Sequence, residues 1–359
     1  MKHIIYTAFI LLLASACSKP APSPETEKEQ YGRYIFFSQQ VGTKADLIES
    51  AAAMDQFGVV GFKYEGTWAD KKASLTPNVF YDDNSNPVNT ETLTCNDDGT
   101  ADYAPLQGWS SFKNYAFFAY YPISHRDQTD HEAMALVNLD GTPYSAGVPA
   151  IKYTMNQSDL KASMVDVMTA PAHTDLYWKS ATDNNTTGEV TFSFAHRLSC
   201  IEVKISNSSE CRINIKSIKV ILAGITHSEI IIPLDGTEDT KPSLDSPLSA
   251  ELPLSGIAET GDMIEPSSDI EFDDKLILIP QENPVSIRVE IIYDRYRNTT
   301  GYLDHTVTLP NIEQPALTTI LNRGIKHQVQ LNFTDATVEI SGLADTGWTE
   351  THNIEDTFN

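Results

Sequence analysis

The chain has 359 residues, and 49 acidic against 25 basic side chains give it a formal net charge of −24 at pH 7. A protein this acidic repels nucleic acid and anionic lipid head groups, because their binding is carried largely by contacts from Lys and Arg. The composition therefore excludes nucleic-acid binding, and the length suits two domains of ordinary size.

The N-terminus has the pattern of a secretory signal peptide over residues 1–16. Lys2 and His3 precede an apolar run at 4–14, which is shorter than the roughly 20 residues of a membrane-spanning helix. Cys17 follows small residues directly, so we expect lipoprotein processing, with palmitate or a similar acyl group on its sulfur. Two or three acyl chains would anchor the mature N-terminus stably. The alternative is a soluble secreted protein in which this cysteine is incidental.

Residues 17–30 are rich in proline and charge, and we expect them to form a disordered tether. From residue 31 onward, short aromatic and β-branched runs alternate with clusters of Gly, Pro, Asn and Asp, as strands do with turns. The strand candidates of this first block are 34–41, 58–64 and 115–121. One helix candidate, 45–57, has apolar residues near helical spacing but could equally be a loop.

A second block of strand candidates starts near residue 188 and alternates apolar with polar residues. Its members are 190–195, 201–205, 213–220, 285–291, 329–333 and 338–340. Period-two patterning with one polar face predicts antiparallel sheets whose inner faces pack together. We therefore predict an all-β protein of two tandem β-sandwich domains, 31–187 and 188–359, with the boundary in the polar stretch 180–188.

Three cysteines remain in the mature chain: Cys95, Cys200 and Cys211. An odd number spread so widely is not a disulfide framework. Cys200 and Cys211 flank a turn-like segment and could bridge in an oxidising compartment, although two small apolar strand residues are the simpler interpretation. The sequence leaves this pair open.

Sequence templates for catalysis and cofactor binding are missing. The chain has no Gly-x-Gly-x-x-Gly, phosphate loop, Gly-x-Ser-x-Gly or His-Glu-x-x-His motif, and its Ser-x-x-Lys matches at 110–113 and 158–161 lack companion motifs. The acidic run 82–86 begins like a calcium loop, but Pro87 replaces the glycine of the sharp turn and Leu93 replaces the bidentate Glu. We therefore predict no cofactor, no metal and no enzyme activity.

Several segments occur in a fixed order over nearly the whole mature chain. They are 35–38, 43–45 and 57–62; Trp109 with 117–122; 166–170 with 190–198 and 201–205; and 342–348. This ordered set, behind a lipoprotein signal, resembles the fimbrillin-like family of Bacteroidetes, which comprises lipoprotein-derived pilins and their anchor and tip accessory subunits.

The resemblance implies an outer-membrane lipoprotein of two transthyretin-like sandwich domains, assembled into fimbriae by strand exchange with other subunits. It also allows an adhesion ligand on a host or bacterial surface. In such pilins a protease cuts after an arginine in a Thr-Arg-Ala context, and Lys44 stands at that position here. A trypsin-like protease could cut there, whereas an arginine-specific one would not. Arg33 is the nearest upstream arginine, but cutting there would leave the first strand in place.

Strand exchange would replace the first strand, beginning with Tyr34, Ile35, Phe36 and Phe37, by a strand of a neighbouring subunit. Main-chain hydrogen bonds and buried alternate side chains stabilise such β-augmentation. The chain's own C-terminal donor candidate, 349–359, has only Ile354 and Phe358 as large apolar groups. An accessory, tip or anchor role therefore fits at least as well as a stalk role.

Two other functions remain as alternatives. A surface glycan-binding lipoprotein would use exposed aromatic platforms, for which Trp68, Trp109 and Trp178 are the candidates, although tryptophans more often anchor cores. An extracellular hydrolase would need a cleft in which the fold clusters carboxylates of shifted pKa.

Overall fold

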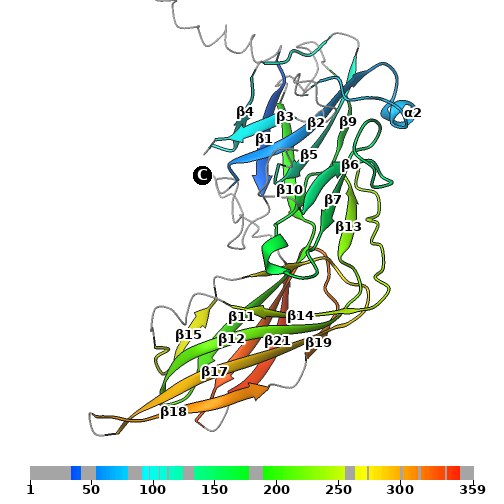
Figure 1. Ribbon diagram of the computed structural model, residues 1–359. Helices are drawn as coiled ribbons and strands as arrows, with labels where there is room; N and C mark the ends of the chain where they lie inside the picture. The colour runs from blue at the N-terminus through cyan, green and yellow to red at the C-terminus, as the bar shows by residue number, and fades with distance from the viewer. Residues whose placement is uncertain are drawn as a thin grey trace, which may run out of the picture.

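The computed structural model describes residues 34–41, 54–79, 91–96, 98–104, 106–110, 113–123, 133–177, 189–254, 263–272, 275–299, 302–313, 317–335 and 338–347. These residues form two β-rich lobes (Figure 1). The helical elements among them are the short helix α2 (Trp68–Lys71) and the 3-10 helix η3 (Lys161–Ser163). None of the helices in these ranges is long and apolar enough to cross a membrane. The all-β prediction is confirmed.

The larger sheet of the first lobe closes on itself. Its strands follow the order β2 (Gln56–Tyr64), β3 (Glu91–Cys95), β4 (Thr100–Asp102), β1 (Phe36–Val41), β10 (Glu189–His196), β8 (Met168–Thr169), β5 (Asn114–Tyr121) and β9 (His173–Tyr177). Because β2 also pairs with β5, the hydrogen-bonded path returns to its start. β1 is therefore an interior strand of a closed sheet.

A small sheet of β13 (Glu229–Pro233), β7 (Ala150–Thr154) and β6 (Met134–Val137) completes the first lobe. Strands β2 and β5 are buried on both faces, because alternate residues enter two different hydrophobic clusters. Phe57 and Phe117 pack in one cluster, while Phe62 and Phe118 pack in the other together with Tyr153 of β7. Burial on both faces explains why 58–64 and 115–121 are apolar almost throughout.

The second lobe is a sandwich of two sheets. One has the order β15 (Ser268–Glu271), β11 (Ser199–Asn207), β20 (Ile325–Phe333) and β21 (Val338–Gly347), with β16 (Leu276–Leu278) also on β11. The other has the order β14 (Leu248–Pro253), β12 (Arg212–Ile225), β17 (Val285–Thr299) and β18 (Tyr302–Glu313), with β19 (Leu317–Thr319) on β17. Alternation along β12 and β20 matches one buried face per strand.

The pairing of strands corrects two details of the sequence interpretation. Strand β10 pairs with β1 and β8, and β13 pairs with β7, so both belong to the first lobe although they follow the predicted boundary at 187/188. The polar stretch 180–188 joins two strands of one sheet, and the chain first passes to the second lobe between β10 and β11. In addition, the pairs β1–β10 and β11–β20 are parallel rather than antiparallel.

Candidate functional site: the first strand and its neighbours

The first strand lies between two strands that come from distant parts of the chain. β1 runs parallel to β10 over six residue pairs, from Phe36 opposite Glu189 to Val41 opposite Phe194. Its other edge pairs with β4 over two residues only. Before the strand, Ile35 N donates to Gln107 O at 2.9 Å. Loss of β1 would therefore expose the long edge of β10 and the short edge of β4.

The inward face of β1 is fully buried. Ile35, Phe37 and Gln39 are each 2% exposed or less. The Phe37 ring stacks on Phe192 of β10, with ring centroids 5.6 Å apart, and meets Phe117 of β5 edge-on at 5.4 Å. Burying one such apolar side chain contributes roughly 1.5–3 kcal/mol. Phe37 is thus the main apolar anchor of the strand.

Gln39 places a polar group among these apolar side chains. The Cys95 thiol of β3 donates to Gln39 Oε1, with 2.8 Å between sulfur and oxygen. Burial raises the pKa of the Cys95 thiol to about 11, so it keeps its proton at neutral pH and remains a donor. A buried amide without such a partner would be costly, and this contact makes Gln39 acceptable inside the closed sheet.

The outward face of β1 is less buried and carries both Phe36 and Ser38. The hydroxyls of Ser38 and Thr191 of β10 lie 2.8 Å apart. The hydroxyl of Tyr103 donates to the carbonyl oxygen of Ile35 at 2.7 Å. Both groups orient the strand, but the inward face supplies most of the buried apolar surface that holds it.

A second cluster of polar side chains lies at the junction of the lobes. Within the first lobe, His196 Nδ1 and Asp166 Oδ1 are 2.8 Å apart and both side chains are buried. Arg197, which follows β10, pairs with Asp239 of the first lobe, and Asp239 also lies 3.6 Å from Arg323, between β19 and β20. No motif or spacing in the sequence predicts these pairs, although Asp166 and Arg197 lie in the segments 166–170 and 190–198 of the family resemblance.

A comparison with protein families identifies the family to which this chain belongs. The model of a family described as fimbrillin-like matches residues 43–348. The chain belongs to the fimbrillin-like family. The matched range includes β4 and β10, the two strands that pair with β1. It also includes the charged residues at the junction of the lobes.

The fold of the fimbrillin-like chain is similar to that of one of the two solved structures compared below, the first. A fimbrial protein from Bacteroides vulgatus shares 18% identity, covers 88% of this chain and 100% of its own, and superposes with a TM-score of 0.57. A candidate cell adhesion protein from Bacteroides ovatus shares 17% identity over 88% of this chain and 95% of its own, with a TM-score of 0.46. No curated protein matches the sequence.

The structure describes only some of the residues of this fimbrillin-like chain that were predicted to take part in strand exchange. Strand β1 starts at Phe36, and Tyr34 forms an isolated bridge with Gly108. Of the helix candidate 45–57, the last two residues instead begin β2, and residues 45–53 lie outside the described ranges. The lipidation, cleavage and donor positions also lie outside them, namely Cys17, Arg33, Lys44, Ile354 and Phe358.

The tryptophans proposed as sugar platforms are not free surfaces where the structure describes them. Trp68 is 6% exposed and packs against Phe62 and Phe118, with ring centroids 4.9 and 5.2 Å away. Trp109 is half-buried against Tyr115 at 4.9 Å. Trp178 lies outside the described residues. Trp68 is therefore a core residue, and the platform interpretation is wrong for it.

The two cysteines left open by the sequence are unbonded. Cys200 and Cys211 are both free and buried. Cys200 lies on β11 and Cys211 directly precedes β12, and these strands belong to opposite sheets of the second lobe. Each cysteine acts as a small apolar core residue.

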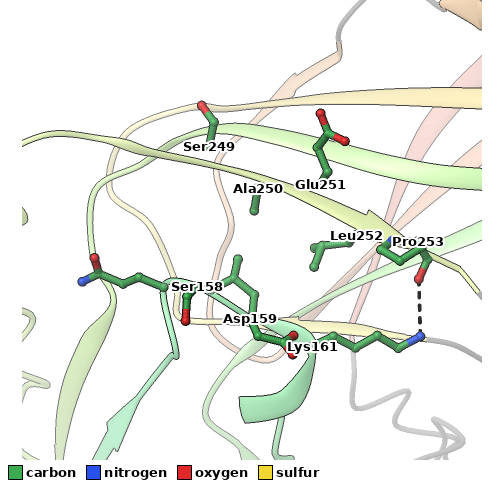
Figure 2. Close-up of a pocket in the computed structure, with 10 residues that line it drawn as sticks. Ser158, Asp159, Lys161, Ser249, Ala250, Glu251, Leu252 and Pro253 are labelled. Atoms are coloured by element: carbon green, nitrogen blue, oxygen red, sulfur yellow. Dashed lines mark hydrogen bonds between the residues drawn. The ribbon is translucent and has the colours of Figure 1, made fainter.

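A cavity of about 530 Å³ lies between the lobes, lined by residues 157–161 and by β14 (Figure 2). Its Ser158 hydroxyl donates to Asn156 Oδ1 at 2.7 Å, and its Lys161 ammonium donates to the carbonyl of Pro253 at 3.3 Å. Both members of this Ser-x-x-Lys match thus make structural contacts. In the described part of the chain, no group of three or more His, Cys, Asp or Glu side chains could hold a metal ion.

Proposed function

We propose that this chain is a lipid-anchored subunit of a surface fimbrium, which is cut before β2 and then accepts a strand of another subunit in place of β1. The observation that carries the proposal is the position of β1. It is the first strand of the described chain, it is interior to a closed sheet, and its inward side chains lie in the core. Because β1 precedes every other described strand, one cut between β1 and β2 would separate it from its neighbours β4 and β10.

The energetics favour replacement over simple loss. Ile35 and Phe37 each contribute roughly 1.5–3 kcal/mol by burial, and main-chain hydrogen bonds to β10 and β4 add to this. Without β1 the closed sheet would have two open edges and an exposed apolar floor, which is the usual acceptor for β-augmentation. A donor strand with equivalent side chains would restore the core.

Whether the lipid anchor stays on the protein depends on the same cut. Cys17 would carry the acyl chains that deliver the protein to the outer membrane. If the chain is cut after Lys44, the lipid leaves with β1, and the anchor serves only to bring the protein to the outer membrane. If Lys44 is spared, Cys17 is the permanent attachment of an accessory or anchor subunit. In both cases the protein works by binding and assembly rather than catalysis.

Mass spectrometry of the N-terminus in fibres sheared from intact cells tests the proposal. We expect the chain to start at Ala45 and to be recovered in oligomers that resist sodium dodecyl sulfate. Lys44→Ala should leave an acylated Cys17 peptide and chains that remain with the membrane, whereas Lys44→Arg should still be cut. Fibres in which residues 34–41 remain joined to residues 45–359 would contradict strand replacement.

A further inference from the structure

The side chains of β1 show what the groove selects, because Ile35, Phe37 and Gln39 are buried in it. Three alternate residues point inward: Ile35, Phe37 and Gln39. In the direction of β1, the groove therefore holds two large apolar groups two residues apart, followed two residues later by a side-chain amide. This inward pattern is a template for any strand that replaces β1.

The apolar positions are shaped by aromatic rings. Phe37 lies against Phe117, Phe192 and Tyr103, with centroid distances of 5.4, 5.6 and 5.7 Å. These rings come from β5, β10 and the segment after β4, so they are part of the groove and not of the departing strand. A charged side chain in this position would be buried without a partner among the rings that surround it.

The third inward position is polar because a residue of the groove donates a hydrogen bond to it. Cys95 belongs to β3, and its thiol donates to the amide oxygen of Gln39 at 2.8 Å. The thiol stays in place when β1 leaves. A donor strand with an amide oxygen at this position satisfies it, whereas an apolar residue there leaves the partly buried thiol without its acceptor.

The segment 349–359 of this chain does not match the template. Residues two apart in it never form two large apolar groups: Ile354 is followed by Asp356, and Asp356 by Phe358. Any register places a polar or charged side chain in the position of Ile35 or Phe37. A second copy of this segment is therefore a poor occupant.

We propose that the groove left by β1 takes an extended strand from a different subunit, with large apolar residues two apart and a side-chain amide two residues further along, and not residues 349–359 of a second copy. The inference rests on the proposed strand replacement and adds the identity of the partner. It makes the chain an acceptor for a strand of another protein rather than for residues 349–359 of a second copy.

Peptide exchange into the intact protein tests this. A Cys17→Ala variant of residues 17–359 carries a recognition sequence for a site-specific protease within 42–53, and cutting leaves β1 bound but no longer tethered. Labelled peptides are then added: residues 34–41, the same peptide with Gln39→Leu, the same with Phe37→Asp, and residues 349–359. Fluorescence anisotropy measures uptake, and gel filtration confirms it.

The peptide 34–41 should exchange, and the Phe37→Asp and 349–359 peptides should bind at least ~100-fold more weakly because each buries a charge or leaves an apolar site unfilled. Gln39→Leu should weaken binding ~5-fold, the value of one hydrogen bond, and a Cys95→Ala protein should reduce that difference. Binding of 349–359 within tenfold of 34–41, or a loss of affinity from Gln39→Leu that is as large in the Cys95→Ala protein as in the protein with Cys95, would overturn the partner inference. If the cut protein keeps its circular dichroism spectrum but takes up no 34–41 peptide, strand replacement itself fails.

Discussion

The Phe37 ring is the main apolar contact that holds β1, so its removal should have a large effect on stability. Phe37→Ala removes contacts with Phe117 and Phe192 and leaves a cavity in the closed sheet. Large-to-small changes of buried Phe cost about 3–5 kcal/mol. We expect a loss of that size in urea unfolding of the first lobe, followed by the fluorescence of Trp68 and Trp109.

The matched control is Phe36→Ala on the same strand. Phe36 is half-buried and points to the other face, so its loss should cost no more than about 1.5 kcal/mol. Proteolysis should separate the two variants as well, since only Phe37→Ala should make β1 and its flanking chain readily cleaved under native conditions. Equal effects of both changes would show that the strand is not held by its inward face.

At the scale of elements, the contact between β2 and β5 closes the first sheet, and Gly58 sets how closely these strands approach. Gly58 stands opposite Tyr120, and a Cβ on Gly58 would lie 2.6 Å from the Tyr120 ring. Glycine inside a strand often marks such a close approach. We expect Gly58→Ala to destabilise the first lobe by about 1–3 kcal/mol, the usual cost of overpacking, as measured by thermal and urea unfolding.

Gly236→Ala is the control for this change. Gly236 has a positive φ of 80° but nothing within 4 Å of an added Cβ, so Gly236→Ala should cost about 1–2 kcal/mol from backbone strain alone, without a steric clash. Combining Gly58→Ala with Tyr120→Ala should remove the clash while adding a cavity, and the two changes should therefore not be additive. Additive effects would place the cost of Gly58→Ala elsewhere.

Local pattern predicted most strands but not their partners. The alternation at 190–195, 213–220 and 329–333 corresponds to β10, β12 and β20, because one face of each strand is buried. The position of β10 beside β1 depends on residues more than 140 positions apart, which no local period encodes. For the same reason the composition of 180–188 suggested a boundary inside one sheet.

The candidate site, too, could be predicted from the sequence only in part. The segment around Ile35 and Phe37 could be recognised as a strand because aromatic and β-branched residues crowd there. Its parallel pairing, and the contact of Gln39 with Cys95, arise only when β3 and β10 meet around it. The first strand was therefore predictable as an element, whereas the selectivity of its groove was not.

At the scale of the whole molecule, the two lobes share one continuous hydrophobic cluster and a group of charges, of which Arg197 and Asp239 are largely buried and Arg323 is exposed. The cluster includes Phe62 of the first lobe and Leu331 of the second. Next to it, Arg197 is held by Asp239, and its guanidinium also donates to Thr169 at 3.2 Å. Burial lowers the pKa of Arg197 while Asp239 raises it, so the carboxylate offsets the cost of keeping this cation out of water.

Asp239→Asn therefore tests how the lobes are held together. The change keeps the shape of the side chain but leaves Arg197 as a buried cation without its anion, and Arg323 loses the same partner. Removing one member of a buried ion pair costs about 3–5 kcal/mol. We expect a loss near the lower end, because Arg323 is half exposed, together with faster hydrogen exchange at 166–170 and 321–324 and a broader small-angle scattering profile.

Two further variants test whether the lost charge of Asp239 is the cause of the destabilisation. Glu251→Gln removes an exposed partner of Lys219 in the second lobe and should cost no more than about 1 kcal/mol. Arg197→Met combined with Asp239→Leu replaces the pair by apolar groups and should recover most of the stability lost in Asp239→Asn, since such replacements are often neutral. If the double variant is as unstable as Asp239→Asn, the junction depends on the hydrogen bonds of Arg197 rather than on its charge. If Asp239→Asn changes neither stability nor exchange, the shared hydrophobic cluster alone joins the lobes.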